Sequence, residues 1–145
     1  MSVADANAAI RIRQRWNRRG HKLALRHGIC TAFSMVRIST HALDTLHGCP
    51  AAGMRVILRR PNQGIVVADV HLNTDGRPDE ALFEGMDDSG EPWELEFDVG
   101  SYFREQGVSS PFLDLVPVRF RTIAAGRFHV PLVCSPWAYQ TYRGS

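Results

Sequence analysis

Lysine is almost missing from this sequence, which has a single one, Lys22, in 145 residues. The part of the chain after residue 35 therefore has no amine side chain for Schiff-base chemistry or for a phosphate loop. A glycine-rich phosphate loop and the motifs H-E-x-x-H and G-x-S-x-G are also absent from the sequence. The nucleotide-binding, zinc-protease and α/β-hydrolase classes consequently have no support.

Cysteine is scarce as well. Cys30, Cys49 and Cys134 are odd in number, widely spaced and free of any C-x-x-C pair. This pattern argues against a disulfide scaffold and against a thiolate zinc site, and it favours a reducing compartment. A length of 145 residues is enough for one domain that buries its own core without such cross-links.

Positive charge is concentrated at the start of the chain. Seven of the 17 basic residues but only one of the 15 acids precede Val36, so the remainder carries ten basic and fourteen acidic residues. An acidic domain lacks the positive surface that nucleic-acid binding needs. The chain also lacks an apolar run long enough to span a membrane or to form a good secretory signal. We therefore expect neither nucleic acid nor a membrane as a partner.

The charge boundary predicts two regions, a basic extension over residues 1–35 and a folded domain over residues 36–145. Met35 stands directly before the first convincing strand, so the extension is either an upstream misassignment of the translation start or a disordered segment. Arginine-rich, acid-poor segments also serve as targeting peptides. We expect a cytoplasmic protein, with a periplasmic or organellar location if the extension is a targeting segment.

Short segments in which apolar and polar residues alternate recur after residue 35, and such alternation is typical of half-buried strands. The predicted strands are 36–41, 54–58, 65–73, 92–99, 116–121, 128–133 and a terminal aromatic run from residue 137. One short helix is expected over 101–106, with Asp98 as its cap and Gly107 at its end. Seven or eight strands with one helix predict an all-β sandwich.

Acids and prolines within these strands carry further expectations. In the strand over 92–99, the acids Glu94, Glu96 and Asp98 should face water, because the apolar residues between them face the core. Pro117 and Pro131 cannot donate a hydrogen bond to a ladder. They should therefore lie at sheet edges or at irregularities of the pairing.

Two histidines are predicted to point away from the core. The alternation that buries Val36 and Ile38 places His41 on the opposite face of its strand, and the same pattern turns His129 outward. An outward face with uncharged neighbours is often an interface between subunits. Arg77 follows an Asp-Gly turn and should therefore leave that turn in a defined direction.

The chain end adds further polar groups. The terminal aromatic run can hold Tyr142 and Arg143 on a strand, close to the hydroxyl and the carboxylate of Ser145. A neutral imidazole can take a proton from water, a second one can give a proton to a leaving nitrogen, and an arginine can hold an oxyanion. Together with His41, His129 and Arg77, these groups suit hydrolysis of an activated amide in a small planar anion.

The histidines also have ordinary explanations. Most exposed histidines are bystanders, and His21, His27 and His47 are placed in that class, whereas the acidic and amide neighbours of His71 could orient it. Two or three converging histidines could instead bind zinc. No i,i+4 spacing or carboxylate partner supports such a site, so we expect no metal.

Four motifs of the domain resemble those of one known family. They are Ile38 to Thr45 with Gly48 and Pro50-Ala51, Thr74 to Arg77, Phe128 to Leu132 followed by Ser135-Pro136, and Tyr142 to Ser145. In this order they are similar to the 5-hydroxyisourate hydrolases, the transthyretin-related enzymes of urate breakdown. The resemblance covers Val36 to Ser145. One departure is Arg127-Phe128, where the family often has His-Tyr.

The resemblance implies a transthyretin-like β-sandwich of two four-stranded sheets with one short helix. It also implies a homotetramer, a dimer of dimers, with the active sites in the channel where the dimers meet. The catalytic residues that it implies are His41, Arg77, His129 and Ser145. The substrate-binding residues that it implies are His41, Arg77, Tyr142, Arg143 and Gly144.

The implied activity is hydrolysis of 5-hydroxyisourate to 2-oxo-4-hydroxy-4-carboxy-5-ureidoimidazoline, without a cofactor or a metal. His41, assisted by His129, would activate the water, and Arg77 would steady the anionic purine and the oxyanion. The sequence leaves open which histidine is the base. Two alternatives also stay open, namely a transthyretin-type small-molecule carrier without catalysis and an interaction protein that acts through the basic extension.

Overall fold

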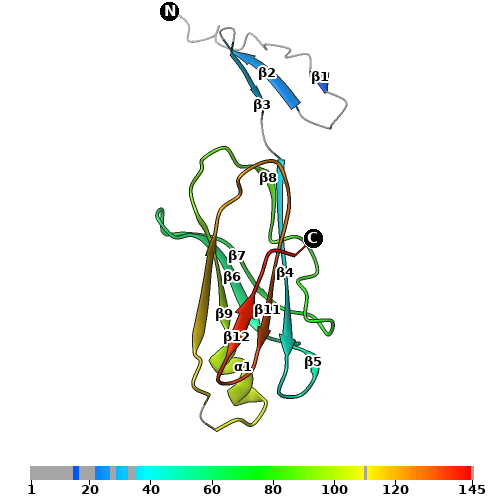
Figure 1. The fold of residues 1–145 in the computed structure, drawn as a ribbon, viewed down its shortest axis with the longest axis vertical. Helices are drawn as coiled ribbons and strands as arrows, with labels where there is room; N and C mark the ends of the chain where they lie inside the picture. The colour runs from blue at the N-terminus through cyan, green and yellow to red at the C-terminus, as the bar shows by residue number, and fades with distance from the viewer. Residues whose placement is uncertain (1–14, 17–21, 27–28, 33–34, 110, 145) are drawn as a thin grey trace, which may run out of the picture. The chain divides into compact units, whose positions relative to one another are not determined.

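The chain divides into two compact units, Met1–Phe33 and Ser34–Ser145, each of which is described by itself. The structure, a computed structural model, describes residues 15–16, 22–26, 29–32, 35–109 and 111–144 (Figure 1). Within these residues, no helix is long and apolar enough to cross a membrane.

The first unit contains one small sheet. The strands β1 (Arg15–Trp16), β2 (Lys22–Arg26) and β3 (Ile29–Ala32) pair in an antiparallel manner, with β2 in the middle. This pairing does not test whether residues 1–35 are a disordered extension or a misassigned start. The predicted division into a basic extension over residues 1–35 and a domain over residues 36–145 stays a prediction.

In the second unit, one layer is a four-stranded antiparallel sheet, here named the β9 sheet. Its strands are β6 (Arg55–Arg60), β7 (Ile65–His71), β9 (Trp93–Asp98) and β10 (Leu115–Phe120), in the order β10-β9-β6-β7. The edges of the sheet are therefore β10 and β7. Pro117 lies on the edge strand β10, as predicted.

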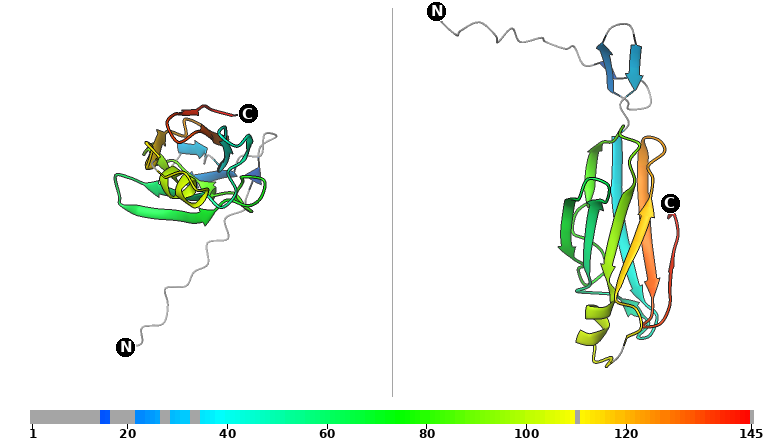
Figure 2. Two further views of the ribbon diagram at one scale, coloured as in Figure 1. Left: turned by 90° about the horizontal axis from the view of Figure 1, so that it is seen from below. Right: turned by 90° about the vertical axis from the view of Figure 1, so that its left-hand side faces the viewer.

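The other layer is the β11 sheet. Its strands are β4 (Met35–Asp44), β5 (Cys49–Pro50), β8 (Phe83–Met86), β11 (Gly126–Cys134) and β12 (Tyr139–Thr141). β11 lies between β12 and β4 and is parallel to β4, while β5 and β8 both pair with β4. Figure 2 shows the two sheets as facing layers with the helix at one end. The predicted sandwich is confirmed, but this sheet has five strands where four were expected. The sequence did not indicate β5 and β8, because these strands are too short to show alternation.

The core lies between the two sheets and follows the predicted alternation. Val36 and Ile38 of β4, Phe97 of β9 and Leu132 of β11 are all at most 1% exposed. Full burial of a side chain of this size contributes about 1.5–3 kcal/mol relative to leaving it in water. The residues between them consequently point to the outer faces of the sandwich.

One predicted outward acid is in fact buried. Glu94 is only 6% exposed, although it lies on the outer face of β9. β9 is flanked by β6 and β10, and these neighbours place Arg59 and Arg119 against the Glu94 carboxylate. The prediction that Glu94 faces water was wrong because alternation identifies the face but not the side chains that cover it.

The helix α1 (Val99–Glu105) forms where it was expected. The Asp98 side chain accepts a hydrogen bond from the Ser101 amide at 3.0 Å, which satisfies one free amide of the first turn. Gly107, two residues after the helix, has a φ of +85°, which favours glycine over residues with a side chain. α1 packs at the end of the sandwich through residues such as Phe103, which is fully buried.

Candidate functional site

The outer face of the β11 sheet brings His41 and His129 together. In the parallel pairing of β4 with β11, His129 lies opposite Ser39, and Pro131 lies opposite His41. The two imidazole rings stack with 6.5 Å between their centroids and 28° between their planes. Two strands that are far apart in the sequence thus place both histidines on one surface, as the alternation predicted.

Ser39 holds the ring of His129. Its Oγ lies 3.0 Å from Nδ1 of His129, so this hydroxyl occupies one ring nitrogen and leaves Nε2 for another partner. Ser39 shares its face with His41, two residues along the same strand, because strand side chains alternate. The sequence pattern places Ser39 on this face but does not reveal the contact, which depends on the pairing with β11.

A tight turn positions Arg77 beside His41. Gly76 has a φ of +69°, and a Cβ atom at that residue would lie 2.5 Å from the carbonyl oxygen of Ala42. The Ala42 amide donates to the carbonyl of Gly76 at 2.9 Å, and Asn73 Oδ1 accepts from the Arg77 amide at 3.2 Å. The turn is therefore docked directly on β4, at the residue after His41, and glycine is required for that close approach.

The chain end runs back along β11 to His129, with a gap in the pairing at a proline. β12 pairs with β11 from Cys134 to Leu132, and the pairing resumes only at the bridge between His129 and Gly144. Pro131, which lies between these points, has no amide hydrogen, and its carbonyl accepts from the Thr141 hydroxyl at 2.9 Å. This is the irregularity that was predicted for Pro131.

Gly144 lies against the imidazole of His129. Its amide donates to the His129 carbonyl at 2.8 Å, and a Cβ atom there would lie 2.7 Å from Cδ2 of the ring. A side chain at this position would therefore displace the ring. Together with Ser39, which lies at Nδ1, Gly144 restricts the ring of His129 from two sides.

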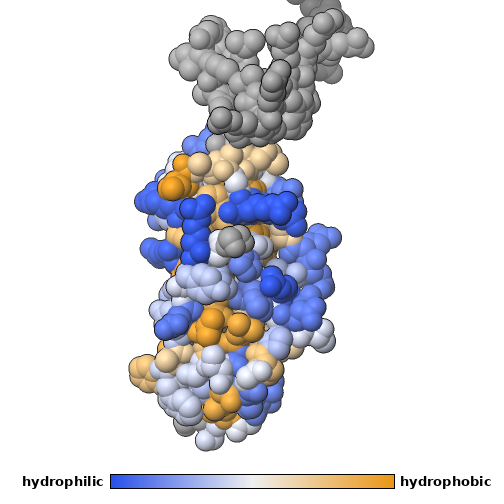
Figure 3. Space-filling view, turned by 45° about the vertical axis from the view of Figure 1, so that its right-hand side comes forward, coloured by the Kyte–Doolittle hydropathy of each residue, from blue (hydrophilic) through white to orange (hydrophobic). Residues whose placement is uncertain are grey.

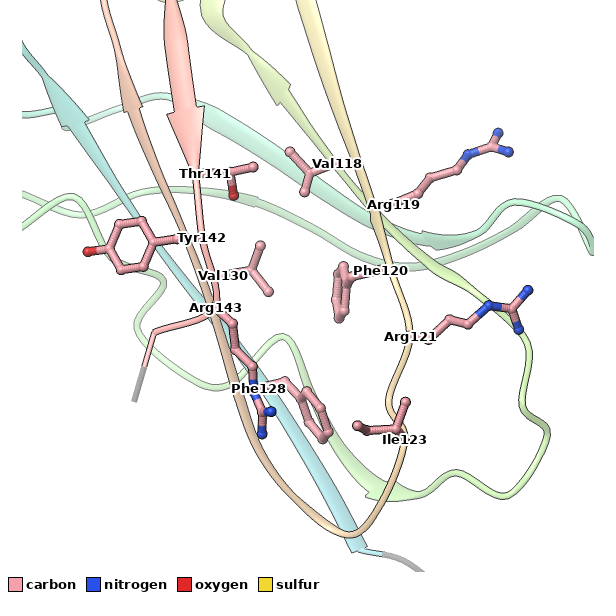
Figure 4. A pocket seen from close by; sticks show the side chains of 10 residues that line it. All are labelled: Val118, Arg119, Phe120, Arg121, Ile123, Phe128, Val130, Thr141, Tyr142 and Arg143. Atoms are coloured by element: carbon pink, nitrogen blue, oxygen red, sulfur yellow. The ribbon is translucent and has the colours of Figure 1, made fainter.

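Tyr142 and Arg143 point in different directions. Along an extended segment, Tyr142 shares the face of Gly144, whereas Arg143 points to the opposite side. The Arg143 guanidinium lies 5.2 Å above the ring of Phe128, and both residues line a cavity of about 290 Å³ between the edges of the two sheets. In Figure 4, Arg143 extends toward Phe128, and the Tyr142 ring points away from this cavity.

The predicted site residues are thus only partly assembled. The structure brings together His41, His129, Arg77 and Gly144, and it places Tyr142 on the same side of the chain end as Gly144. Arg143 is turned to the edge of the sandwich, and Ser145 lies outside the described residues. The roles of all seven residues stay predictions.

The environment keeps both histidines neutral at neutral pH. Burial lowers the pKa of His41, and the positive charge of Arg77 and the neighbouring His129 lower it further. Burial also lowers the pKa of His129, again with a contribution from Arg77. A neutral imidazole can accept a proton, so both rings are competent as bases. The charge of Arg77 also makes this pair a poor site for a cation.

The described residues contain no group of three histidines, cysteines or acids that could hold a metal ion. His71 lies on β7 of the other sheet and is not part of the site. His47 binds the buried carboxylate of Asp44 through Nδ1 at 2.6 Å, so its contact is structural. His21 and His27 lie outside the described residues.

His129 borders an open, positively charged cavity. Its volume is about 410 Å³, and its lining consists of Arg37, Ser39, Arg77, Arg127 and His129. No carboxylate belongs to this lining. Figure 3 shows strongly hydrophilic residues gathered in the upper part of one face of the second unit. A cavity of this kind suits a small, polar anion.

One known protein family matches most of the chain. The family described as the HIUase/Transthyretin family matches residues 38–144. The chain belongs to this family. A 5-hydroxyisourate hydrolase of Rhizobium meliloti (strain 1021) is 45% identical over 115 residues, which cover 75% of this chain and 96% of that protein.

Solved structures place this HIUase/transthyretin family member among transthyretin-like folds. A Klebsiella pneumoniae 5-hydroxyisourate hydrolase has a TM-score of 0.67 and 29% identity, covering 76% of this chain and 99% of that one. An (S)-allantoin synthase has a TM-score of 0.70 and 36% identity, but the match covers 78% of this chain and only 45% of the synthase. Sea bream transthyretin, at 22% identity and a TM-score of 0.64, covers 74% of this chain and 94% of that one and shows the fold alone. The predicted transthyretin-like fold is confirmed.

Proposed function

We propose that this chain hydrolyses 5-hydroxyisourate to 2-oxo-4-hydroxy-4-carboxy-5-ureidoimidazoline in urate degradation. The observation that carries the proposal is the pair of neutral histidines beside Arg77 on one outward sheet face. The 45% identical Rhizobium meliloti relative, which is named for this activity, aligns over nearly its whole length. The cavity beside the histidines has the positive charge that an anionic purine requires.

In the proposed mechanism, His41 takes a proton from a water molecule that attacks the ring carbonyl. Arg77 stabilises the oxyanion of the tetrahedral intermediate, and the bond between the carbonyl carbon and the ring nitrogen then breaks. The proton that His41 took from the water passes through His129 to the leaving nitrogen, so both imidazoles end neutral, and the carboxylic acid that forms loses its proton to solvent. The protein supplies these groups itself, and no step requires a metal or a cofactor.

The contact with Ser39 supports this division of roles. When Nδ1–H of His129 donates to the Ser39 hydroxyl, Nε2 of the neutral ring is free to receive the proton from His41 and to pass it to the leaving nitrogen. Among the hydrogen bonds of the described residues, none involves the ring of His41, which leaves that ring available to a water molecule. We therefore assign His41 as the base and His129 as the acid.

The test is ultraviolet decay of freshly generated 5-hydroxyisourate with the full chain and with His41→Ala. General base catalysis contributes about 10²–10⁴-fold, so the substitution should reduce the rate by that factor. His71→Ala, a histidine on the other sheet, is the matched control and should keep the activity. Decay at the uncatalysed rate with the folded, unsubstituted protein would refute the proposal and favour the transthyretin-type carrier.

The proposal includes assembly as a homotetramer, a dimer of dimers, with the substrate in the channel between dimers. Two features support it: the edge strand β12 is exposed along all three residues, and the histidines lie on an outward face. Sedimentation velocity should give a single species of four chains. A monomer that retains full activity would refute this part of the proposal.

We also propose a cytoplasmic location, supported by the cysteines. Among the described residues, Cys49 and Cys134 are free thiols, and burial raises the pKa of Cys134 to about 12, which keeps it unreactive. Fractionation of cells that express the tagged chain tests the location. A chain that begins at Met35 tests whether the extension contributes to location or to activity, since an inactive truncated chain would place function in the extension.

A further inference from the structure

Two arginines stand side by side next to the histidines. In the register of β4 with β11, Arg127 lies opposite Arg37, and like charges directly opposite each other are unfavourable. On the other side of Arg37, β8 brings Glu84 within 2.9 Å of its guanidinium. Arg37 is therefore balanced by an acid, whereas Arg127 has no ion pair among the described residues.

Arg127 belongs to the same surface as the proposed active site. It precedes His129 by two residues on β11, which places the two Cα atoms about 7 Å apart on one face. The cavity of about 410 Å³ is lined by both residues and by Arg77, the arginine assigned to the oxyanion. Within this lining, Arg127 adds a positive charge that pairs with no carboxylate of the described residues and that the proposed chemical step does not use.

We propose that Arg127 is a capture residue, which attracts the anionic substrate into the cavity without taking part in the chemical step. The inference rests on the proposed function, because it names how that same site acquires its substrate. Arg127 is exposed, so its guanidinium acts through charge at a distance rather than through a fixed contact. A charge that acts this way changes kcat/KM and its salt dependence and leaves kcat unchanged.

The experiment measures kcat and kcat/KM for Arg127→Gln in 10 mM and in 0.15 M salt. A unit charge about 7 Å from an anion in water changes its binding about two- to threefold at low salt. In 0.15 M salt the effect should shrink to about 1.5-fold because screening shortens the reach of the charge. The reversal Arg127→Glu changes the charge by two units. It should therefore lower kcat/KM at low salt by approximately the square of the factor for Arg127→Gln, which is about fivefold.

Four further variants separate charge from structure. Arg104→Gln and Arg104→Glu remove and reverse the same charge on the exposed end of α1, where Arg104 contacts Ser101 and Asp114, and should leave kcat/KM unchanged. Arg127→Lys keeps the charge and should retain kcat/KM. Glu84→Gln removes the carboxylate that pairs with Arg37. It should raise kcat/KM at low salt by about the same factor by which Arg127→Gln lowers it.

Equal salt dependence in Arg127→Glu and Arg104→Glu would overturn the inference, as would a loss in kcat rather than in kcat/KM. Failure of the proposed function is distinguishable, because the unsubstituted protein would then not accelerate the decay at any salt concentration. If hydrolysis occurs but Arg127→Lys loses as much as Arg127→Gln, the residue acts through its shape, and the capture role is refuted.

Discussion

The two sheets of the sandwich carry different arrangements of charge on their outer faces. On the β9 sheet, each arginine of the outer face contacts a carboxylate on a neighbouring strand. These pairs are Arg119–Glu94, Arg59–Glu96 and Arg55–Asp69. On the face of the β11 sheet, Arg37 pairs with Glu84, but Arg127 and the turn residue Arg77 have no ion pair among the described residues, and they lie near two histidines.

This difference separates a face that stabilises the fold from a face that is available to a ligand. Paired charges hold neighbouring strands together and leave little net charge for an incoming molecule. Unpaired cations lower the pKa of neighbouring histidines, as Arg77 does for His41 and His129, and they attract anions. Substitutions on the β11 sheet should therefore change catalysis, and substitutions on the β9 sheet should change stability.

Among the substitutions that compare the two faces, the largest effect is expected for Arg77→Ala. Loss of a group that stabilises an oxyanion costs about 10²–10³-fold in kcat. The matched substitution Arg119→Ala removes an arginine of the paired face and should leave kcat unchanged. Stopped-flow decay of 5-hydroxyisourate gives both values. If the two variants lost activity equally, the two faces would not differ in function.

The pH dependence should follow the lowered histidine pKa values. Because the neutral imidazole is the base, kcat should stay constant near neutral pH and fall about tenfold per unit below a pKa that lies under the ordinary 6.5. In Arg77→Ala this acid limb should move only part of the way toward pH 6.5. Burial, which is the larger cause of the lowered histidine pKa values, remains in that variant. A pH–rate profile with its acid limb above 6.5 in the unsubstituted protein would contradict the assignment.

The same shift affects stability. A histidine whose pKa is lowered in the folded state binds fewer protons there than in the unfolded chain, so the free energy of unfolding decreases as pH falls through 6.5.

Ser39→Ala should have a smaller effect. The loss of one hydrogen bond of about 1 kcal/mol corresponds to about a fivefold lower kcat, because the ring of His129 then loses its partner at Nδ1. Ser39→Thr keeps the hydroxyl and should restore most of the activity. A merely structural role predicts a lower melting temperature in Ser39→Ala with an unchanged pH–rate profile, and that result would refute the positioning role.

Glu94→Gln should leave kcat unchanged but lower the free energy of unfolding. Glu94 is buried and serves both Arg119 and Arg59, so removal of its charge should cost about 1–3 kcal/mol. Asp69→Asn breaks an exposed pair on the same face and should cost less, since solvent already screens that pair. Urea unfolding of both variants tests this order. A loss of activity in Glu94→Gln would show that the face of the β9 sheet also affects catalysis, which would contradict the proposed difference between the two faces.

Much of the fold could be predicted because it depends on local patterns. Alternation identified the buried sides of β4, β9 and β11, and the cap at Asp98 identified α1. β5 and β8 were missed because two and four residues are too short to show a period. The burial of Glu94 was missed because its covering arginines lie on other strands.

The sequence by itself determined that His41 and His129 face outward, since period two is a property of each strand alone. Only the tertiary structure decided that these strands are neighbours, that Ser39 meets His129 across 90 positions, and that the chain end pairs with His129 through Gly144. The physical reason is that the face of a residue follows from its own strand, whereas register depends on backbone pairing and packing between distant segments.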